Sequence, residues 1–174
     1  MEEKVTVSQV GLKYGLIIGL VFIVYGMILQ FLNLDMKLMQ NLSYLNYVAL
    51  AAVIYFAHKA FKEGGDGYMS IGQGLGSGTL ISLVGGALSG VFSYIYLSFI
   101  DDSMITKVKD AQITEMEARG MDDAQIEQAM NIAGNLMTPL MMAVLSVVFM
   151  VIFGFIISLI VSLFTKKANP TLEV

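Results

Sequence analysis

The chain has no cysteine and no tryptophan, and it has one histidine and two prolines among its 174 residues. Without cysteine it can form no disulfide, no thiolate nucleophile and no cysteine-ligated metal site. A single histidine leaves little material for a zinc or haem centre. We therefore expect no metal and no cofactor. The net charge of −4, with no basic stripe, also argues against nucleic acid as a partner.

Charged residues are missing from four long stretches. No Asp, Glu, Lys or Arg occurs within residues 14–34, 38–57, 67–100 and 128–165. The hydrocarbon core of a bilayer, about 30 Å thick, takes roughly 20 apolar residues in a helix. Each stretch reaches that length, so the sequence predicts an all-α integral membrane protein with four transmembrane helices.

We expect these spans at about residues 11–32, 44–61, 70–100 and 139–164, within one membrane domain over residues 1–174. Residues 33–43 form a short link, so the first two spans should make an antiparallel hairpin. Thr138 followed by Pro139 is typical of a helix start. Glu2-Glu3-Lys4 is a poor start for a signal peptide, which favours a retained first helix.

Lysine and arginine are unevenly divided between the two predicted sides of the membrane. One side holds both termini and the second link, the other holds the first link and residues 101–135. Since positive residues concentrate in cytoplasmic segments, both termini are predicted to be cytoplasmic. The terminal side carries Lys4, Lys13, Lys59, Lys62, Lys166 and Lys167, against Lys37, Lys107, Lys109 and Arg119 on the other.

Small residues recur every four positions in the third span and form one ridge along a helix. The first span repeats the spacing. In lipid, small side chains let helix backbones approach closely. We expect the third span to cross the first within one chain; a homodimer seam and a pore-lining face remain alternatives. The helix-packing ridge consists of Gly74, Gly78, Ser82, Gly86 and Gly90, with Gly11, Gly15 and Gly19 in the first span.

The loop at residues 101–135 is acidic, with eight Asp and Glu residues. Its composition favours helix, and Gly120 should divide it in two. Asp122 is placed as an N-cap, with Gln125 as its capping-box partner. We therefore predict an extramembrane helical loop between spans three and four. It is either a solvated cap or a docking surface for a partner.

The spans hold no ionisable side chain at mid-membrane, where such residues usually mark transport or proton pathways. His58 and Lys13 lie near span ends, and the single His58 is interpreted as structural. The serines within the spans have no base nearby in the sequence, and they can bond back to their own helix. We therefore expect no enzymatic activity.

Several segments together resemble the bacterial membrane family known as domain of unknown function 4199. They include residues 65–74 (GDGYMSIGQG), Phe99-Ile100-Asp101-Asp102, residues 121–130 (MDDAQIEQAM), Thr138-Pro139 and the closing Lys166-Lys167. The chain has Ile71 and Gly74 where the family usually has Phe and Ala, and Asp102 where it has Pro. The resemblance covers essentially the whole chain, and it implies a compact four-span protein of the bacterial inner membrane without known catalytic residues.

The leading functional hypothesis is a structural or accessory membrane protein that acts by helix packing or partner binding. Its surroundings would be the lipid bilayer, and its partner either a second copy of the chain or another membrane protein. The alternative is a small-solute channel or transporter, since pores for neutral solutes need no intramembrane charge.

Overall fold

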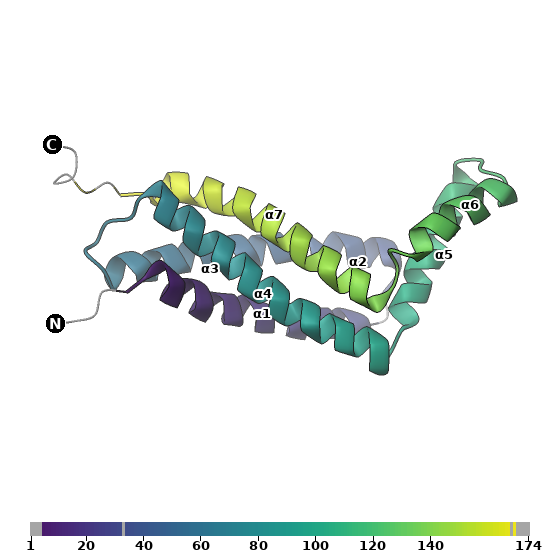
Figure 1. Cartoon of the computed structure of the whole chain (residues 1–174), viewed down its shortest axis with the longest axis horizontal. Coiled ribbons are helices and arrows are strands. Elements are labelled where there is room, and N and C mark those ends of the chain that lie inside the picture. Colours follow the sequence, from purple (N-terminus) through teal and green to yellow (C-terminus); the bar gives the residue numbers. More distant parts are fainter. Residues whose placement is uncertain (1–4, 33, 168, 170–174) are drawn as a thin grey trace.

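The chain folds into helices, and the computed structural model describes residues 5–32, 34–167 and 169. Four long helices lie side by side along the long axis (Figure 1): α1 (Val7–Phe31), α3 (Leu45–Glu63), α4 (Ile71–Phe99) and α7 (Pro139–Thr165). Three shorter ones are α2 (Met36–Ser43), α5 (Ser103–Ala118) and α6 (Asp123–Gly134). The described residues contain no strand, only an isolated bridge between Met69 and Lys167. The all-α prediction is confirmed.

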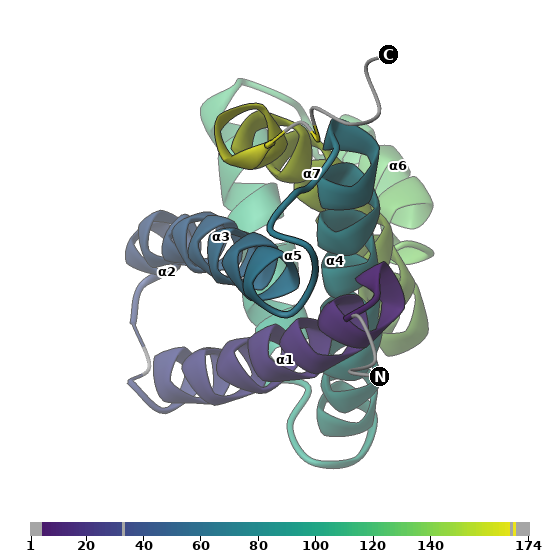
Figure 2. The ribbon, with the colours of Figure 1, turned by 90° about the vertical axis from the view of Figure 1, so that its left-hand side faces the viewer.

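Seen end-on, α4 lies between α1 and α7, and α3 completes the bundle opposite α4 (Figure 2). The buried core runs along the inner faces of α1, α3 and α4. Most of its side chains are aliphatic. Phe61, near the end of α3, and Met69, just before α4, complete it. The core consists of Val10, Ile18, Leu50, Ile54, Ala57, Phe61, Met69 and Ile81.

Polar residues at the helix starts explain where these helices begin. Thr6 and Ser70 cap α1 and α4, and each exchanges hydrogen bonds with a glutamine three residues on, which satisfies free backbone N–H groups. Thr138 caps α7, and Pro139 occupies the first turn, where its missing N–H costs nothing.

Three helices are long and apolar enough to cross a membrane, judged by length and composition: α1, α4 and α7. By this measure three of the four predicted spans are candidate membrane spans, and α3 is not. The reason lies in the composition of α3, whose apolar stretch is bounded by Asn46 at one end and by His58 and Lys59 at the other. That stretch is shorter than the roughly 20 apolar residues that span a bilayer.

The predicted link between the first two spans contains a short helix that the sequence analysis did not anticipate. In α2, Asp35 serves as the N-cap, and its side chain accepts a hydrogen bond from Leu38 N at 2.9 Å. Tyr44 alone separates α2 from α3. Asn33, which the link includes, lies outside the described residues. Helix α1 also begins earlier than predicted, at Val7, because the Thr6 cap starts it there.

Short connections join the helices at the end of the bundle where α1 begins and α7 ends, which we call the terminal end (Figure 1). Met69 and Lys167 exchange two backbone hydrogen bonds, of 3.0 and 2.9 Å, and Val5 N donates to Gly64 O at 3.1 Å. The opposite end, the hairpin end, carries α5 and α6, which project beyond the bundle. Lys4, counted above for the orientation, lies outside the described residues.

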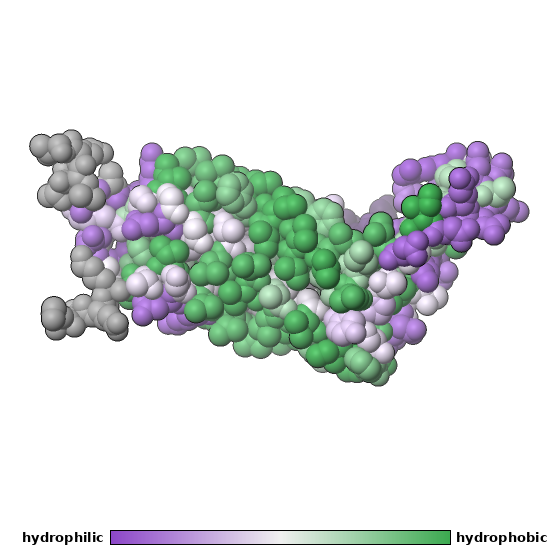
Figure 3. Space-filling model, viewed as in Figure 1, coloured by the Kyte–Doolittle hydropathy of each residue, from purple (hydrophilic) through white to green (hydrophobic). Residues whose placement is uncertain are grey.

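Apolar side chains cover the middle of the face seen in Figure 3, and hydrophilic residues gather at its two ends. Leu20 in α1 and Ile160 in α7 are 57% and 51% exposed. A soluble protein seldom leaves so large a continuous apolar surface in water. An apolar surface of this kind is suited to contact with lipid chains.

Candidate functional site

The glycine ridge of α4 lies against α7, not against α1. Glycines at one position of α4 meet small or flexible residues at the matching position of α7, with the two helices antiparallel. A Cβ on Gly74 would lie 2.5 Å from Ser162 Oγ, and one on Gly90 would lie 2.8 Å from Val147 Cγ2. Such distances leave no room for a side chain. The third span does lie against the first, as expected, but its glycine ridge faces α7.

The pairing in this α4–α7 seam is reciprocal, because glycine stands on either helix. Ser158 of α7 faces Gly78, and Ser82 of α4 faces Gly154, a residue that the sequence analysis did not single out. Periodicity identified the ridge, but it could not show which helix the ridge faces. The contacts of the seam, in order along it, are Gly74 with Ser162, Gly78 with Ser158, Ser82 with Gly154, Gly86 with Met150 and Gly90 with Val147.

The glycines of the first span do contact α4, on a different face from the ridge. A Cβ on Gly11 would lie 2.5 Å from Leu80 Cδ2, and one on Gly15 would lie 2.6 Å from Val84 Cβ. Gly19 meets Leu88 in the same way, at 2.9 Å from its Cδ2. Here α1 and α4 run parallel, and bulky side chains of α4 fit over the glycines of α1. Helix α4 is thus held closely on two sides.

A polar cluster fills the seam near the terminal end. His58 is fully buried, and its two ring nitrogens lie 2.7 Å from Thr165 Oγ1 and 3.0 Å from Gly74 O. Ser77 and Ser158 also donate to Gly74 O, at 2.9 and 3.0 Å. One carbonyl of α4 therefore joins α3, α4 and α7. His58 lies near the end of α3, where the sequence analysis placed it, and its side chain is buried between three helices, in surroundings that suit a structural role.

The hydrogen-bond geometry fixes which nitrogen of His58 carries a hydrogen. A carbonyl oxygen only accepts, so Nε2 must donate to Gly74 O. In the neutral ring, Nδ1 then accepts from the Thr165 hydroxyl. That hydroxyl also lies 2.8 Å from Val161 O, to which it would turn if Nδ1 were protonated. Thr165 can therefore satisfy either state of the ring.

One buried hydroxyl in the cluster lacks a conventional partner. Ser162 Oγ is buried and makes no hydrogen bond within the part of the chain that the structure describes. It faces the Cα of Gly74, where a Cβ would lie 2.5 Å away. A Cα–H group pointing at an oxygen forms a weak hydrogen bond of about 0.5–1 kcal/mol. The Ser162 hydroxyl thus occupies the space that a side chain at position 74 would need.

The predicted cap residues lie in the projecting hairpin, which is formed by α5, the Gly120 turn and α6. Gln125 N donates to Asp122 Oδ1 at 2.8 Å, and Asp122 N donates to Gln125 Oε1 at 3.1 Å. Gly120 has φ +79°, in the left-handed region that glycine adopts easily. The loop is therefore two helices divided at this glycine.

Removing the cap should loosen α6 alone. In Asp122→Ala, the backbone N–H of Gln125 loses its acceptor, and we expect a loss of about 0.5–2 kcal/mol of local helix stability. Amide hydrogen exchange should become faster across α6 and stay unchanged in α4 and α7. Glu117→Gln, an exposed change in α5, is the control and should alter neither. Equal exchange in both variants would show that the cap does not hold α6.

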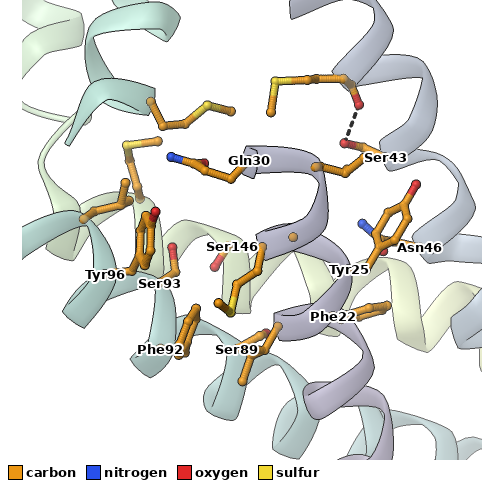
Figure 4. Close-up of a pocket in the computed structure, with 18 residues that line it drawn as sticks. Phe22, Tyr25, Gln30, Ser43, Asn46, Ser89, Phe92, Ser93, Tyr96 and Ser146 are labelled. Atoms are coloured by element: carbon orange, nitrogen blue, oxygen red, sulfur yellow. Dashed lines mark hydrogen bonds between the residues drawn. The ribbon is translucent and has the colours of Figure 1, made fainter. Parts of the chain in front are cut away.

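A cavity of about 410 Å³ lies between α1 and α4 toward the hairpin end (Figure 4). Gly26, Phe22 and Gln30 of α1 line one wall, and Ser93 and Tyr96 of α4 line another. No Asp, Glu, Lys or Arg lines it. Sequence reasoning missed the cavity because small residues predict close packing as readily as a space. A Cβ on Gly26 would meet nothing within 4 Å, unlike one on Gly11 or Gly15 of the same helix.

A hydrogen bond closes the cavity wall toward the hairpin end. Gln30 Nε2 donates to Asp101 Oδ2 at 3.1 Å, and Ser103 N donates to Asp101 Oδ1 at 2.9 Å. Hydrogen bonds from the backbone and hydroxyl of Ser103, and then from Gln30, hold the pKa of Asp101 below its usual value. The carboxylate is therefore ionised at neutral pH, and it links the end of α1 to the start of α5.

The family model described as protein of unknown function (DUF4199) matches residues 13–167. The chain belongs to the DUF4199 family. The match covers α3, α4 and α7, all of α1 except its first six residues, the projecting hairpin and every wall of the cavity. No curated protein and no solved structure matches this DUF4199 chain. Among its described residues, no group of three or more His, Cys, Asp or Glu side chains is placed to hold a metal ion.

Proposed function

We propose that this DUF4199 protein is a four-span accessory protein of the bacterial inner membrane, which holds an acidic helical hairpin outside the bilayer for a partner protein to bind. Its packed helices act as a scaffold, and it has no catalytic role. The observation that carries the proposal is the hairpin itself. No residue of α5 is buried, and the hydrophilic pair α5–α6 projects from the bundle (Figures 1 and 3).

Helix α3 is the fourth span in this proposal, although its composition is less apolar than that of the others. It runs alongside α1, α4 and α7 (Figure 2), and Leu50 and Ile54 are buried in the shared core. His58, its most polar inward residue, has both ring nitrogens bonded. A polar residue whose hydrogen bonds are made inside a bundle costs far less in a membrane than one that faces lipid.

The lysines favour an orientation with both termini in the cytoplasm. Lys59, Lys62 and Lys167 lie at the terminal end, beside Lys166. We expect Glu63→Cys to be shielded from an impermeant thiol reagent in intact cells, and Glu117→Cys in α5 to be labelled. The chain has no cysteine of its own, so the assay has no background. Labelling at position 63 with protection at position 117 would reverse the orientation.

The charge of the hairpin supports a docking role. All six acids between Asp110 and Glu127 are exposed, whereas Ile126 anchors α6 by its burial. Against these six acids the hairpin has three bases, Lys107, Lys109 and Arg119, so its net charge is negative and would steer a basic partner during encounter. A partner with a basic surface facing the same side of the membrane would fit. An acidic hairpin is a poor binder of anionic lipid, which makes a protein the better candidate.

Photo-crosslinking in native membranes tests this proposal. A photoreactive residue replacing Ala118 should give one discrete product with a second protein, and the double change Glu115→Gln, Glu117→Gln should abolish it. The same photoreactive residue replacing Phe56, which is 55% exposed on the apolar surface of α3, is the control and should give no such product. A product at position 118 that survives the charge change, or none, would refute docking through the hairpin. A product of two copies of this chain would identify self-association.

Passage of a small neutral solute is the second candidate, and the cavity favours it. The cavity reaches Ser89 and Ser146 in the middle part of the bundle. Beyond them, the close α4–α7 and α1–α4 contacts continue to the terminal end. Purified protein in liposomes should show no saturable flux of glycerol or urea if it is an accessory protein. A saturable flux that Ser93→Leu blocks would favour transport.

A further inference from the structure

We propose that the cavity at the hairpin end binds an uncharged, membrane-soluble amphiphile whose head carries hydrogen-bond acceptors. The inference goes beyond the accessory role, because it needs no partner protein. The size of the cavity fits such a ligand, since ligand sites commonly measure about 300–1,000 Å³ and this cavity is about 410 Å³. It is only partly enclosed, so that a tail can extend out of it.

The wall contains polar groups that the protein itself leaves without partners. Within the described chain, the amide of Asn46 on α3, the hydroxyl of Ser93 and the phenol of Tyr96 on α4 make no hydrogen bond. Asn46 lies on one side of the site, and Ser93 and Tyr96 lie on the other (Figure 4). Each of these groups can donate a hydrogen bond. A ligand with acceptor oxygens can therefore be held between α3 and α4.

Other polar groups of the wall are already engaged and serve as framework. Tyr25 donates to Leu42 O at 2.9 Å, and Ser43 donates to Met39 O at 2.8 Å. Ser146 bonds back to its own helix in the same way. Of these bonds, the one from Tyr25 joins α1 to α2 and fixes that part of the wall beside the free donors.

The absence of charge on the wall sets the ligand class. A charged head would lose its hydration there without gaining a counter-ion, which is costly. The Asp101 carboxylate, bonded to Gln30, would also repel an anion at this end. Phe22 and Phe92 supply flat apolar surface, and four methionines line the remaining wall. Methionine adapts its shape to a partner, so the cavity can accept a ring or an acyl chain.

Two kinds of membrane molecule share this chemistry, namely a neutral acylglycerol and a lipid quinone. Photolabelling of the full-length protein in nanodiscs, with a monoacylglycerol that carries a photoreactive group near its head, tests the proposal. We expect label on the segments 22–30 and 89–97. Unlabelled monooleoylglycerol or decylubiquinone should compete, whereas oleate, a charged amphiphile, should not. Competition by decylubiquinone alone would identify the quinone as the ligand, and competition by monooleoylglycerol alone the acylglycerol.

Filling the cavity supplies the matched comparison. Gly26→Leu places a side chain into open space in the wall, and we expect labelling to fall at least tenfold with no loss of thermal stability. Gly134→Leu makes the same change in α6, also where nothing lies within 4 Å, and labelling should persist. Asn46→Leu should weaken competition by both neutral probes. Unchanged labelling in Gly26→Leu, labelling spread over lipid-facing α7, or competition by neither neutral probe would overturn the proposal.

Discussion

Replacing Gly78 with alanine is expected to destabilise the bundle strongly, whereas the same change at Gly76 should not. A Cβ on Gly78 would lie 2.5 Å from Ser158 Cβ. Both atoms are fixed by their backbones, so no rotamer relieves the overlap, and α4 must move away from α7. Overpacking of this kind typically costs about 1–3 kcal/mol. On Gly76, the nearest atom would be Val7 Cγ1 at an ordinary 3.7 Å.

Thermal unfolding in mild detergent, followed by circular dichroism, measures the difference. Gly76→Ala should be neutral or up to about 1 kcal/mol more stable, because alanine favours helix. Adding Ser158→Gly to Gly78→Ala removes the opposing atoms and should restore part of the lost stability. Equal melting temperatures for Gly76→Ala and Gly78→Ala would mean that the α4–α7 seam is not closely packed in solution.

His58→Ala is expected to cost about 2–5 kcal/mol of unfolding free energy, through an empty space in the core and lost hydrogen bonds. His58 is fully buried and joins Thr165 of α7 to Gly74 of α4. Lys59→Ala is the neighbouring control. The Lys59–Glu63 ion pair, 3.8 Å long, is mostly exposed, and such pairs contribute little.

Unfolding by denaturant in detergent would report both values, and Lys59→Ala should stay within about 0.5 kcal/mol of the unchanged protein. His58→Phe keeps most of the volume and removes the hydrogen bonds. Its stability should therefore lie between those of His58→Ala and Lys59→Ala. The comparison separates the contribution of packing from that of the hydrogen bonds. A His58→Ala protein as stable as Lys59→Ala would contradict the polar cluster.

Charge and capping patterns predicted most of the helices, because these signals are local. The uncharged stretches marked α1, α4 and α7, and the order Asp122-x-x-Gln125 marked the start of α6. The sequence predicted a span at α3 because the uncharged stretch there is long. It did not take into account the polar residues near both ends of the helix. It also missed α2, although Asp35 is a suitable N-cap.

The candidate site depended on pairing between distant segments, which periodicity does not encode. A ridge of glycines defines a helix face, but α1 and α7 both offered small residues to meet it. The same limit explains why the cavity could not be predicted from the sequence. Gly15 and Gly26 belong to one helix, yet one is covered by Val84 and the other faces open space. That difference arises from where α1 and α4 diverge, which only the assembled bundle shows.

The uneven fastening of the two ends has a mechanical consequence. At the terminal end, the Met69–Lys167 bonds, the Val5–Gly64 bond and the Lys62 ammonium, which donates to Thr165 O at 2.9 Å, tie together every segment that meets there. The glycine contacts between α1 and α4 continue this fastening inward as far as Gly19 and end just before the cavity. Any relative rotation of α1 and α4 therefore has its pivot at the terminal end and its greatest amplitude at the hairpin end. Because Gln30 of α1 is bonded to Asp101, just before α5, such a rotation would change the width of the cavity and the tilt of the hairpin together.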